Sequence, residues 1–373
     1  MQAPSRRELL KGAAGGAAGA FFVSACGAER QGSRDGAPTP TDAVSVEDQR
    51  GTTVTLDRTA DRIVTIPKPA AAMLIAVDKG PSHLVGMHKA SWAAIRDGTL
   101  GEFFPQAKKI PHDIAGQNFT PNVESVVALN PDVVVQWADN GTGIIAPLEN
   151  AGLKVVGLRY GTQEDVDTWI DLFGTLLGKN ERARAINMRT ARRLEEMKKA
   201  ASGVSGSPPK VIYFLSFKEG MKAAGKGSYN DFYIRMVGAE NVAQEVTGLA
   251  SVNVEQVLAW DPDIILLGKN DASVPEDVYQ DKVWADVSAV RTGRVYRVPL
   301  GGYAWDPPSQ ESPLMWRWLF MLAHPHHKPF DLREQVNEDY EFLYGQQPSA
   351  HQLDTILRLD VNDQSANYEQ FQA

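Results

Sequence analysis

Fourteen residues of the chain occur twice, 131 positions apart. Residues 122–135 read NVESVVALNPDVVV, and residues 253–266 read NVEQVLAWDPDIIL. Each copy predicts a short helix that begins after Asn and ends before Pro, and then an apolar run typical of a strand buried on both faces of a parallel sheet. The repeat therefore predicts two equivalent α/β units. A cleft between two such units is a common place to bind a small molecule.

Further apolar runs extend the α/β pattern around each copy. Strands are predicted at 62–66, 84–87, 133–136 and 155–158, then at 211–215, 264–267 and 295–298, with helices at 229–237 and 254–260. Residues 179–202 contain no Pro or Gly and carry apolar residues at helical spacing, which predicts one long helix. We expect a first lobe at 61–178, a linking helix at 179–203, a second lobe at 209–323 and a C-terminal extension at 324–373 that packs on the second lobe.

The N-terminal residues are similar to an export signal. Arg6 and Arg7 form a twin-arginine motif, and residues 12–25 are a small-residue and apolar stretch too short to span a membrane. Residues 23–26, VSAC, resemble a lipoprotein signal-peptidase site, so the only cysteine, Cys26, would become a lipid-carrying N-terminus. The alternative is an uncleaved anchor with an ordinary buried thiol. Residues 27–60 are expected to be a flexible tether and a first strand region.

Charge and cysteine content narrow the class of protein. The formal net charge is -8, and removal of residues 1–25 makes it more negative by two. An acidic exported domain is a poor candidate for nucleic-acid binding. Because no cysteine other than Cys26 is present, the mature domain has no disulfide and is held together by its core.

Five segments carry a resemblance to a known family. They are residues 62–64, both copies of the repeat, residues 238–243 (GAENVA) and residues 291–299 (RTGRVYRVP). In this order they resemble the Fe/B12 periplasmic-binding family, the substrate-binding proteins of ABC importers for iron-siderophores, haem and cobalamin. The resemblance covers residues 61–323. It implies an α/β fold of two Rossmann-like lobes with mostly parallel sheets joined by one long helix, and capture of a ligand without chemistry on it.

The resemblance also implies a partner for the repeat. In that family a glutamate on each lobe docks into arginine pockets of a permease dimer, which works with an ATPase, and Glu124 and Glu255 hold the matching positions. Each falls in the first turn of a predicted helix, where the helix dipole favours a negative charge and side chains face water. The alternative is that both glutamates only stabilise the helix starts. We expect a monomer anchored to the membrane by lipid.

Candidate ligand-binding residues follow the predicted strand ends, where parallel sheets bind ligands. Aromatic faces pack on a bulky chelate, and Lys or His pairs with its oxygens, so this set fits an anionic metal complex. No cofactor of the protein's own is expected. The candidates are Lys68, His88, Trp92, Trp137 and Asp139 in the first lobe, and Phe217, Lys218, Lys226, Tyr229, Lys269, Tyr303 and Trp305 in the second.

Three other functions are alternatives to chelate binding. A bare metal cation needs several converging His, Asp or Glu side chains, and His88 and Asp139 are the candidates, but the second lobe has no histidine between residues 210 and 323. An oxyanion such as molybdate is a further alternative. The histidines at 324, 326 and 327 are more typical of a surface turn than of a metal site. An exported enzyme is a remote alternative, because no nucleophile elbow, HExxH or CxxC motif is present.

Overall fold

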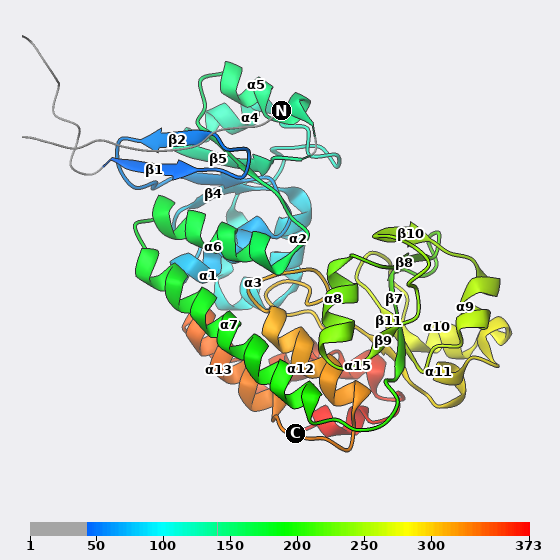
Figure 1. Cartoon of the computed structure of the whole chain (residues 1–373). Coiled ribbons are helices and arrows are strands. Elements are labelled where there is room, and N and C mark those ends of the chain that lie inside the picture. Colours follow the sequence, from blue (N-terminus) through cyan, green and yellow to red (C-terminus); the bar gives the residue numbers. More distant parts are fainter. Residues whose placement is uncertain (1–42, 140) are drawn as a thin grey trace, which may run out of the picture. The chain divides into compact units, whose positions relative to one another are not determined.

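The N-terminal lobe is a parallel sheet covered by helices. The computed structural model describes residues 43–139 and 141–373. The sheet has the order β4-β3-β5-β6 with every pair parallel (Figure 1). Its strands are β3 (Ile63–Thr65), β4 (Leu84–Met87), β5 (Val133–Trp137) and β6 (Val155–Leu158). Its helices are α1 (Ala70–Asp78), α2 (Lys89–Asp97), α3 (Thr99–Phe103), α4 (Val123–Ala128), α5 (Ala146–Asn150) and α6 (Gln163–Leu176).

An antiparallel pair precedes this sheet, in the segment expected to hold a tether and a first strand region. β1 (Val44–Glu47) pairs with β2 (Thr53–Leu56). The turn between them is fixed to β6, because the buried Asp48 carboxylate accepts a hydrogen bond from the Gly157 amide at 2.8 Å and Arg50 donates to the Val155 carbonyl at 2.9 Å. The pair therefore caps the outer strand of the sheet, and the ordered lobe includes residues from Val44 onward.

The second lobe repeats the arrangement with extra antiparallel strands. Its sheet has the order β10-β8-β7-β11-β12, and β9 also pairs with β7. The pairs among β7, β9, β11 and β12 are parallel, whereas β8 pairs antiparallel with β7 and β10. The strands are β7 (Lys210–Ser216), β8 (Lys222–Ala224), β9 (Glu240–Asn241), β10 (Leu249–Ser251), β11 (Ile264–Leu267) and β12 (Val295–Arg297). The helices are α8 (Tyr229–Met236), α9 (Val254–Trp260), α10 (Pro275–Tyr279), α11 (Ser288–Arg291) and α12 (Ser312–Ala323).

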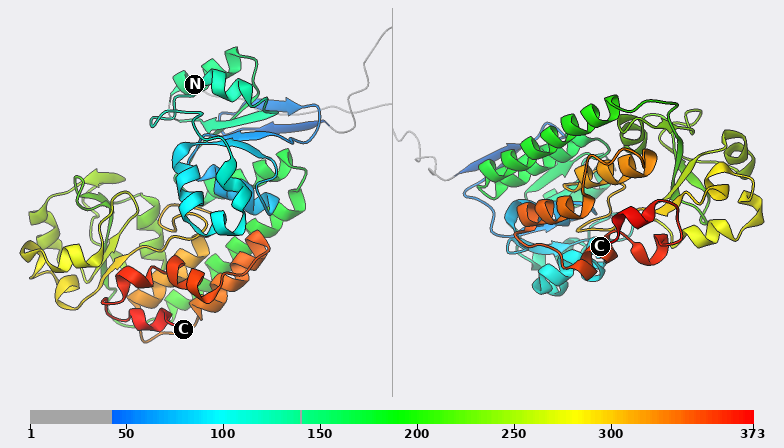
Figure 2. Two further views of the ribbon diagram at one scale, coloured as in Figure 1. Left: turned by 180° about the vertical axis from the view of Figure 1, so that it is seen from behind. Right: turned by 90° about the horizontal axis from the view of Figure 1, so that it is seen from below.

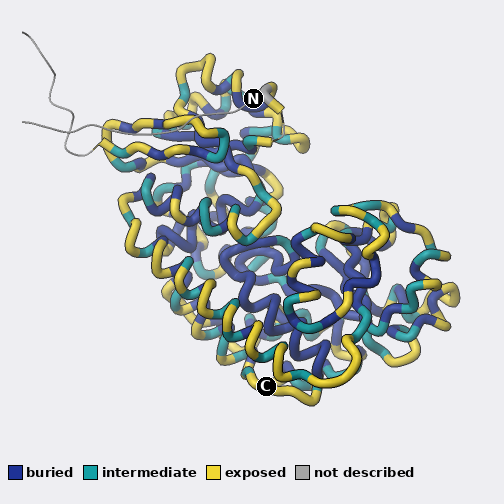
Figure 3. Tube along the Cα trace, viewed as in Figure 1, coloured by how far each residue is buried: buried dark blue, intermediate teal, exposed yellow. Residues whose placement is uncertain are grey.

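Three helices, rather than one, connect the lobes. The predicted linking helix is α7 (Asn180–Ser202), and it packs on α6 of the first lobe and on α12. All twelve residues of α12 are buried, including Arg317, whose guanidinium reaches Glu196 of α7 at 2.8 Å. α13 (Leu332–Tyr344) packs on α12 and on α1 (Figure 2). One hydrophobic core therefore runs from the first sheet through α12 into the second lobe, as the buried residues in Figure 3 show.

The C-terminal extension contacts the second lobe, as the sequence predicted, and it also contacts the first lobe. It continues after α13 with α14 (Ala350–Ile356) and α15 (Leu359–Asn362). Near its end it does pack on the second lobe, where Tyr368 stacks on Tyr296 with ring centroids 5.9 Å apart. α13, however, lies against α1, and Arg182 of α7 donates to the Phe342 carbonyl at 2.6 Å. Because every residue of α1 is buried, the helix must be covered on more than the side that faces the sheet, and α13 covers it there.

The predicted export motif at Arg6 and Arg7, the lipidation site Cys26 and the tether up to residue 42 lie outside the described residues. Within the described part of the chain, none of the helices combines the length and hydrophobicity that a membrane crossing needs.

The fourteen-residue repeat makes the same structural contacts in both lobes. The Asp132 carboxylate accepts hydrogen bonds from the amides of Asp61 and Arg62 at 2.8 and 2.9 Å, and Asp263 accepts one from the Lys210 amide at 2.8 Å. The basic side chain at each site then bonds the C-terminal carbonyls of the repeat helix. Arg62 donates to the Leu129 carbonyl at 2.6 Å, and Lys210 donates to that of Trp260 at 2.6 Å. In each lobe the repeat is thereby tied to the strand that precedes it in the sheet.

We expect removal of either aspartate to destabilise the protein. Asp132→Ala or Asp263→Ala should lower the free energy of unfolding by about 1–3 kcal/mol, because each carboxylate bonds backbone amides at a strand start. Denaturant unfolding measures the change. Asp286→Ala, which removes an exposed carboxylate, is the control and should stay within about 0.5 kcal/mol of the unaltered protein. Equal effects of all three variants would contradict the assigned role.

Candidate ligand-binding site

Side chains from both lobes meet at the carboxyl ends of the parallel strands. In the first lobe, the Lys68 ammonium lies 5.5 Å from the centre of the Phe119 ring. The Phe119 and Trp137 ring centres are 5.5 Å apart, and those of Trp137 and Tyr160 are 5.8 Å apart. These residues follow or end β3, β5 and β6, or lie in the loop before α4. They form one continuous aromatic surface with a lysine at its end.

The second lobe contributes a lysine and a tyrosine. The Lys269 ammonium, just after β11, donates to the Tyr303 hydroxyl at 2.7 Å and lies 3.9 Å from the centre of that ring. The two lobes are close enough here to act on each other electrostatically. Burial and then the positive charge of Lys269 lower the pKa of Lys68, and burial and then Tyr303 raise the pKa of Tyr160. We call the set the interlobe site: Lys68, Phe119, Trp137, Tyr160, Lys269 and Tyr303.

The chemistry of the interlobe site suits an anion with an organic face. Neither cause of the lowered pKa of Lys68 is a carboxylate, and bringing two ammonium groups together is unfavourable without an anion between them. The Trp137 indole N–H is buried and has no hydrogen-bond partner among the described residues. One buried carboxylate, Asp306, lies behind Lys269 and accepts from the Tyr213 hydroxyl at 2.5 Å.

Phe119 and Tyr160 were missed in the sequence. Phe119 has a positive φ of 66°, in the left-handed region that costs a bulky residue about 1–3 kcal/mol, and Gln136 donates to its carbonyl at 3.0 Å. No sequence pattern near Phe119 predicts that a loop phenylalanine is held in this conformation. Tyr160 could have been predicted, because it follows the predicted strand 155–158 as closely as the other candidates follow their strands.

His88 and Trp92 are structural in their contacts. The His88 Nδ1 atom accepts a hydrogen bond from the Ala90 amide at 3.0 Å, and its Nε2–H donates to the Gly116 carbonyl at 3.1 Å. Both ring nitrogens are therefore used, and burial lowers the pKa of this neutral imidazole. Trp92 stacks on His112 with ring centres 4.0 Å apart, away from the interlobe site. Trp92 is therefore placed away from the interlobe site, contrary to the prediction, whereas the His88 ring lies 5.2 Å from the Phe119 ring and borders that site.

Two further candidates contact other parts of the second lobe. Phe217 packs between Phe214 and Trp284 in the core behind the second sheet, so it is a core aromatic and does not face the ligand. Lys218 is exposed and pairs with Asp277 at 2.8 Å. Asp139 is exposed, and Lys226 is exposed and forms a β-bridge with Thr247.

Trp305 and Tyr229 are buried beside the site rather than in it. Trp305 is fully buried, and its indole N–H donates to Glu311 at 2.7 Å. The Tyr229 hydroxyl donates to Gln163 of the first lobe at 3.2 Å and accepts from Trp316 at 3.1 Å. Tyr229 thus holds the lobes together, which sequence position alone did not indicate.

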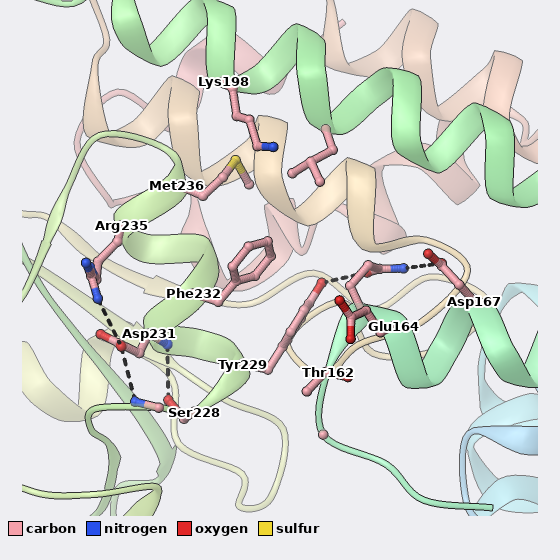
Figure 4. Close-up of a pocket in the computed structure, with 14 residues that line it drawn as sticks. Thr162, Glu164, Asp167, Lys198, Ser228, Tyr229, Asp231, Phe232, Arg235 and Met236 are labelled. Atoms are coloured by element: carbon pink, nitrogen blue, oxygen red, sulfur yellow. Dashed lines mark hydrogen bonds and ion pairs between the residues drawn. The ribbon is translucent and has the colours of Figure 1, made fainter. Parts of the chain in front are cut away.

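A pocket of about 830 Å³ lies beside this contact, between α6, α7 and α8 (Figure 4). In Figure 4 Tyr229 points across the pocket toward the start of α6, and Gln163 in turn donates to Asp167 at 3.0 Å. Lys198 and Arg235 lie at the opposite end, and Arg235 is 3.8 Å from Asp231. Because its walls carry more carboxylates, at Glu164, Asp167 and Asp231, than basic side chains, the pocket is a weaker candidate for an anion than the interlobe site.

No group of three or more His, Asp, Glu or Cys side chains suited to a metal ion occurs among the described residues. His324, in the histidine-rich segment, is buried, and its Nε2 atom bonds the Val237 carbonyl at 2.9 Å.

The repeat presents the same surface in each lobe. Glu124 and Glu255 are exposed in the first turns of α4 and α9, after helix-capping asparagines that accept from backbone amides at 3.2 and 2.8 Å. Three residues further on, and so on the same helix face, Val127 is 45% exposed and Leu258 is 39% exposed. Each lobe therefore shows a carboxylate beside an exposed apolar side chain.

Comparison with known proteins decides the family. The model of the family described as "Periplasmic binding protein" matches residues 113–300. A crystal structure of a periplasmic solute binding protein from Veillonella parvula is 31% identical, covering 86% of this chain and 99% of its own, with a TM-score of 0.80. The chain belongs to the periplasmic binding protein family. The resemblance to the Fe/B12 periplasmic-binding family and the two-lobed α/β fold are thereby confirmed.

Curated periplasmic binding proteins similar to this one differ in ligand. The molybdate-binding protein MolA of Haemophilus influenzae is 23% identical over 322 residues, which are 80% of this chain and 90% of that protein. A cobalamin-binding protein of Halobacterium salinarum is 27% identical over 263 residues, which are 68% of each chain. The family is one of substrate-binding proteins, and its members bind both chelates and an oxyanion.

Proposed function

We propose that this periplasmic binding protein is the substrate-binding component of an ABC importer and that it captures an anionic metal chelate of the iron-siderophore, haem or cobalamin type. The observation that carries the proposal is the interlobe site, where Lys68 lies 5.5 Å from the Phe119 ring centre in one lobe and Lys269 lies 3.9 Å from the Tyr303 ring centre in the other. The carboxylate or catecholate oxygens of a chelate would pair with both ammonium groups, and its organic part would pack on Phe119 and Trp137.

An oxyanion such as molybdate is the second candidate. The same two lysines supply donors for a small tetrahedral anion, and a molybdate-binding relative supports this choice. A bare cation is less well supported, because both ring nitrogens of His88 are already bonded.

Native mass spectrometry and absorption spectra of protein taken from its own cells test the ligand class. We expect a coloured chelate that copurifies, and tight binding of ferric citrate or hydroxocobalamin by the emptied protein. Binding of molybdate with no visible band would favour the oxyanion instead. If none of these probes binds, the anion site itself is wrongly assigned. Recovery of the added chelate unchanged would also support a carrier over an enzyme.

We also propose that the protein is a monomer, exported through the twin-arginine motif at Arg6 and Arg7, and held at the outer face of the cytoplasmic membrane by lipid on Cys26. The order of motif, apolar stretch and cysteine supports this proposal. A permease dimer with its ATPase would be the partner, and Glu124 and Glu255 would contact it, one from each lobe.

We expect only a small change in shape when ligand binds. The lobes share one core through α7, α12 and α13, and two tyrosines bond across them: Tyr160 donates to the Pro308 carbonyl at 2.5 Å and Tyr229 donates to Gln163. Few backbone positions are left to absorb a hinge rotation. Small-angle scattering profiles with and without ferric citrate should nearly superimpose, and a marked compaction would contradict this expectation.

A further inference from the structure

Glu311 is a fully buried carboxylate that collects hydrogen bonds from two separate elements. Its oxygens accept from the Gly302 amide at 3.0 Å, from the Trp305 indole at 2.7 Å and from the Tyr340 hydroxyl at 3.0 Å. The Tyr344 hydroxyl donates as well. Burial raises the pKa of Glu311 to about 7, against the opposing effect of these donors. Every donor matters here, because a buried carboxylate that loses a partner has no water to replace it.

The donors belong to a ligand-site loop and to the C-terminal extension. Gly302 and Trp305 lie in the loop of residues 299–306, which carries Tyr303 of the interlobe site, whereas Tyr340 and Tyr344 lie on α13. The loop is also tied to α14, since the Leu300 amide donates to the Ile356 carbonyl at 3.0 Å.

The loop approaches Glu311 so closely that no side chain fits at two of its positions. A Cβ atom at residue 301 would overlap Glu311 and the Tyr340 hydroxyl, and one at residue 302 would overlap Glu311 and the Tyr344 hydroxyl. Gly301 and Gly302 are therefore required by close backbone approach. The carboxylate and the loop backbone are in direct contact, so a shift of one moves the other.

We propose that Glu311, together with Tyr340 and Tyr344, is a positioning residue for the interlobe site, and that the C-terminal extension is thus part of the ligand-binding apparatus. The inference rests on the proposed function only in taking Tyr303 as a ligand-site residue. Glu311 touches no residue of that site itself. It accepts from the Gly302 backbone on one side of Tyr303 and from the Trp305 side chain on the other, and the Tyr303 hydroxyl in turn accepts from the Lys269 ammonium at 2.7 Å.

Hydrogen exchange and ligand affinity together test the proposal. Tyr340→Phe and Tyr344→Phe each delete one donor to Glu311 and keep the aromatic ring, and Glu311→Gln keeps the shape of the acceptor. Tyr296→Phe is the matched control, because it deletes one buried hydroxyl that bonds the extension at Ala366, away from the loop. In the ligand-free protein, amides of residues 300–306 should exchange about tenfold faster or more in the first three variants and at the unaltered rate in the control.

Binding of ferric citrate, hydroxocobalamin and molybdate is measured on the same four variants and on the unaltered protein. For each probe that the unaltered protein binds, the first three variants should bind about tenfold more weakly. Tyr296→Phe should bind with unchanged affinity, even if its thermal stability falls as much as that of the other three. Unchanged exchange at 300–306 would overturn the proposal, as would faster exchange with unchanged affinity. If none of the three probes binds the unaltered protein, the proposed ligand class fails, while the exchange rates still decide whether Glu311 holds the loop.

Discussion

Replacement of both Lys68 and Lys269 by methionine should weaken the binding of ferric citrate or molybdate by about two orders of magnitude or more. Each ammonium is partly buried, and loss of a buried charge partner typically costs about 2–5 kcal/mol. The folded protein should not lose stability, since the change removes two charges that repel each other and keeps similar apolar stems. A loss of affinity without a loss of stability is the signature we expect.

Isothermal titration calorimetry gives the affinity, and Lys218→Met is the matched control because Lys218 is exposed and paired with Asp277. The same titrations show a pH dependence. The pKa of Lys68 lies below its ordinary value in the free protein, so a bound anion should raise it and proton uptake should accompany binding at alkaline pH. Affinity should fall as pH rises through that lowered pKa. Equal affinity in the double variant would remove the lysines from the site.

The sequence predicted strands well where burial on both faces leaves an apolar run. β5 and β11, in the two copies of the repeat, are of this kind, and so is the long helix α7. The short strands β8, β9 and β10 were not predicted, because two or three residues of mixed polarity carry no periodic signal. β8 and β9 pair with β7, and β10 pairs with β8, so these strands form only beside partners from other parts of the chain.

The candidate site was predictable in position more than in residues. Strand ends led to Lys68 and Lys269, both of which lie in the interlobe site, since the carboxyl edge of a parallel sheet follows from topology. The direction in which each side chain points did not follow from the topology of the sheet. His88 turns back to cap its own helix, and Trp305 turns inward to Glu311, and both choices depend on partners that only the folded chain supplies. The role of the extension was hidden for the same reason, because Tyr340 and Tyr344 meet Glu311 only in three dimensions.

Reversal of charge at Glu124 and Glu255 should abolish uptake while leaving ligand affinity intact. Both glutamates are exposed, and neither contacts the interlobe site. A permease surface with basic pockets would then face two arginines, and like charges brought together across an interface cost several kcal/mol. The variants are Glu124→Arg, Glu255→Arg and the pair. Either single change should impair uptake if both lobes engage the permease at once.

Uptake of labelled ferric citrate or molybdate into cells, beside the affinity of the purified variants, measures the effect. Glu195→Arg, a reversal at an exposed glutamate of α7, controls for net charge. Val127→Ser and Leu258→Ser should each reduce uptake in part, because these exposed apolar side chains share the helix face of the glutamates. A loss of ligand affinity would instead place the glutamates at the ligand. Normal uptake, with stability lower by a few tenths of a kcal/mol, would mean that they only stabilise the helix starts.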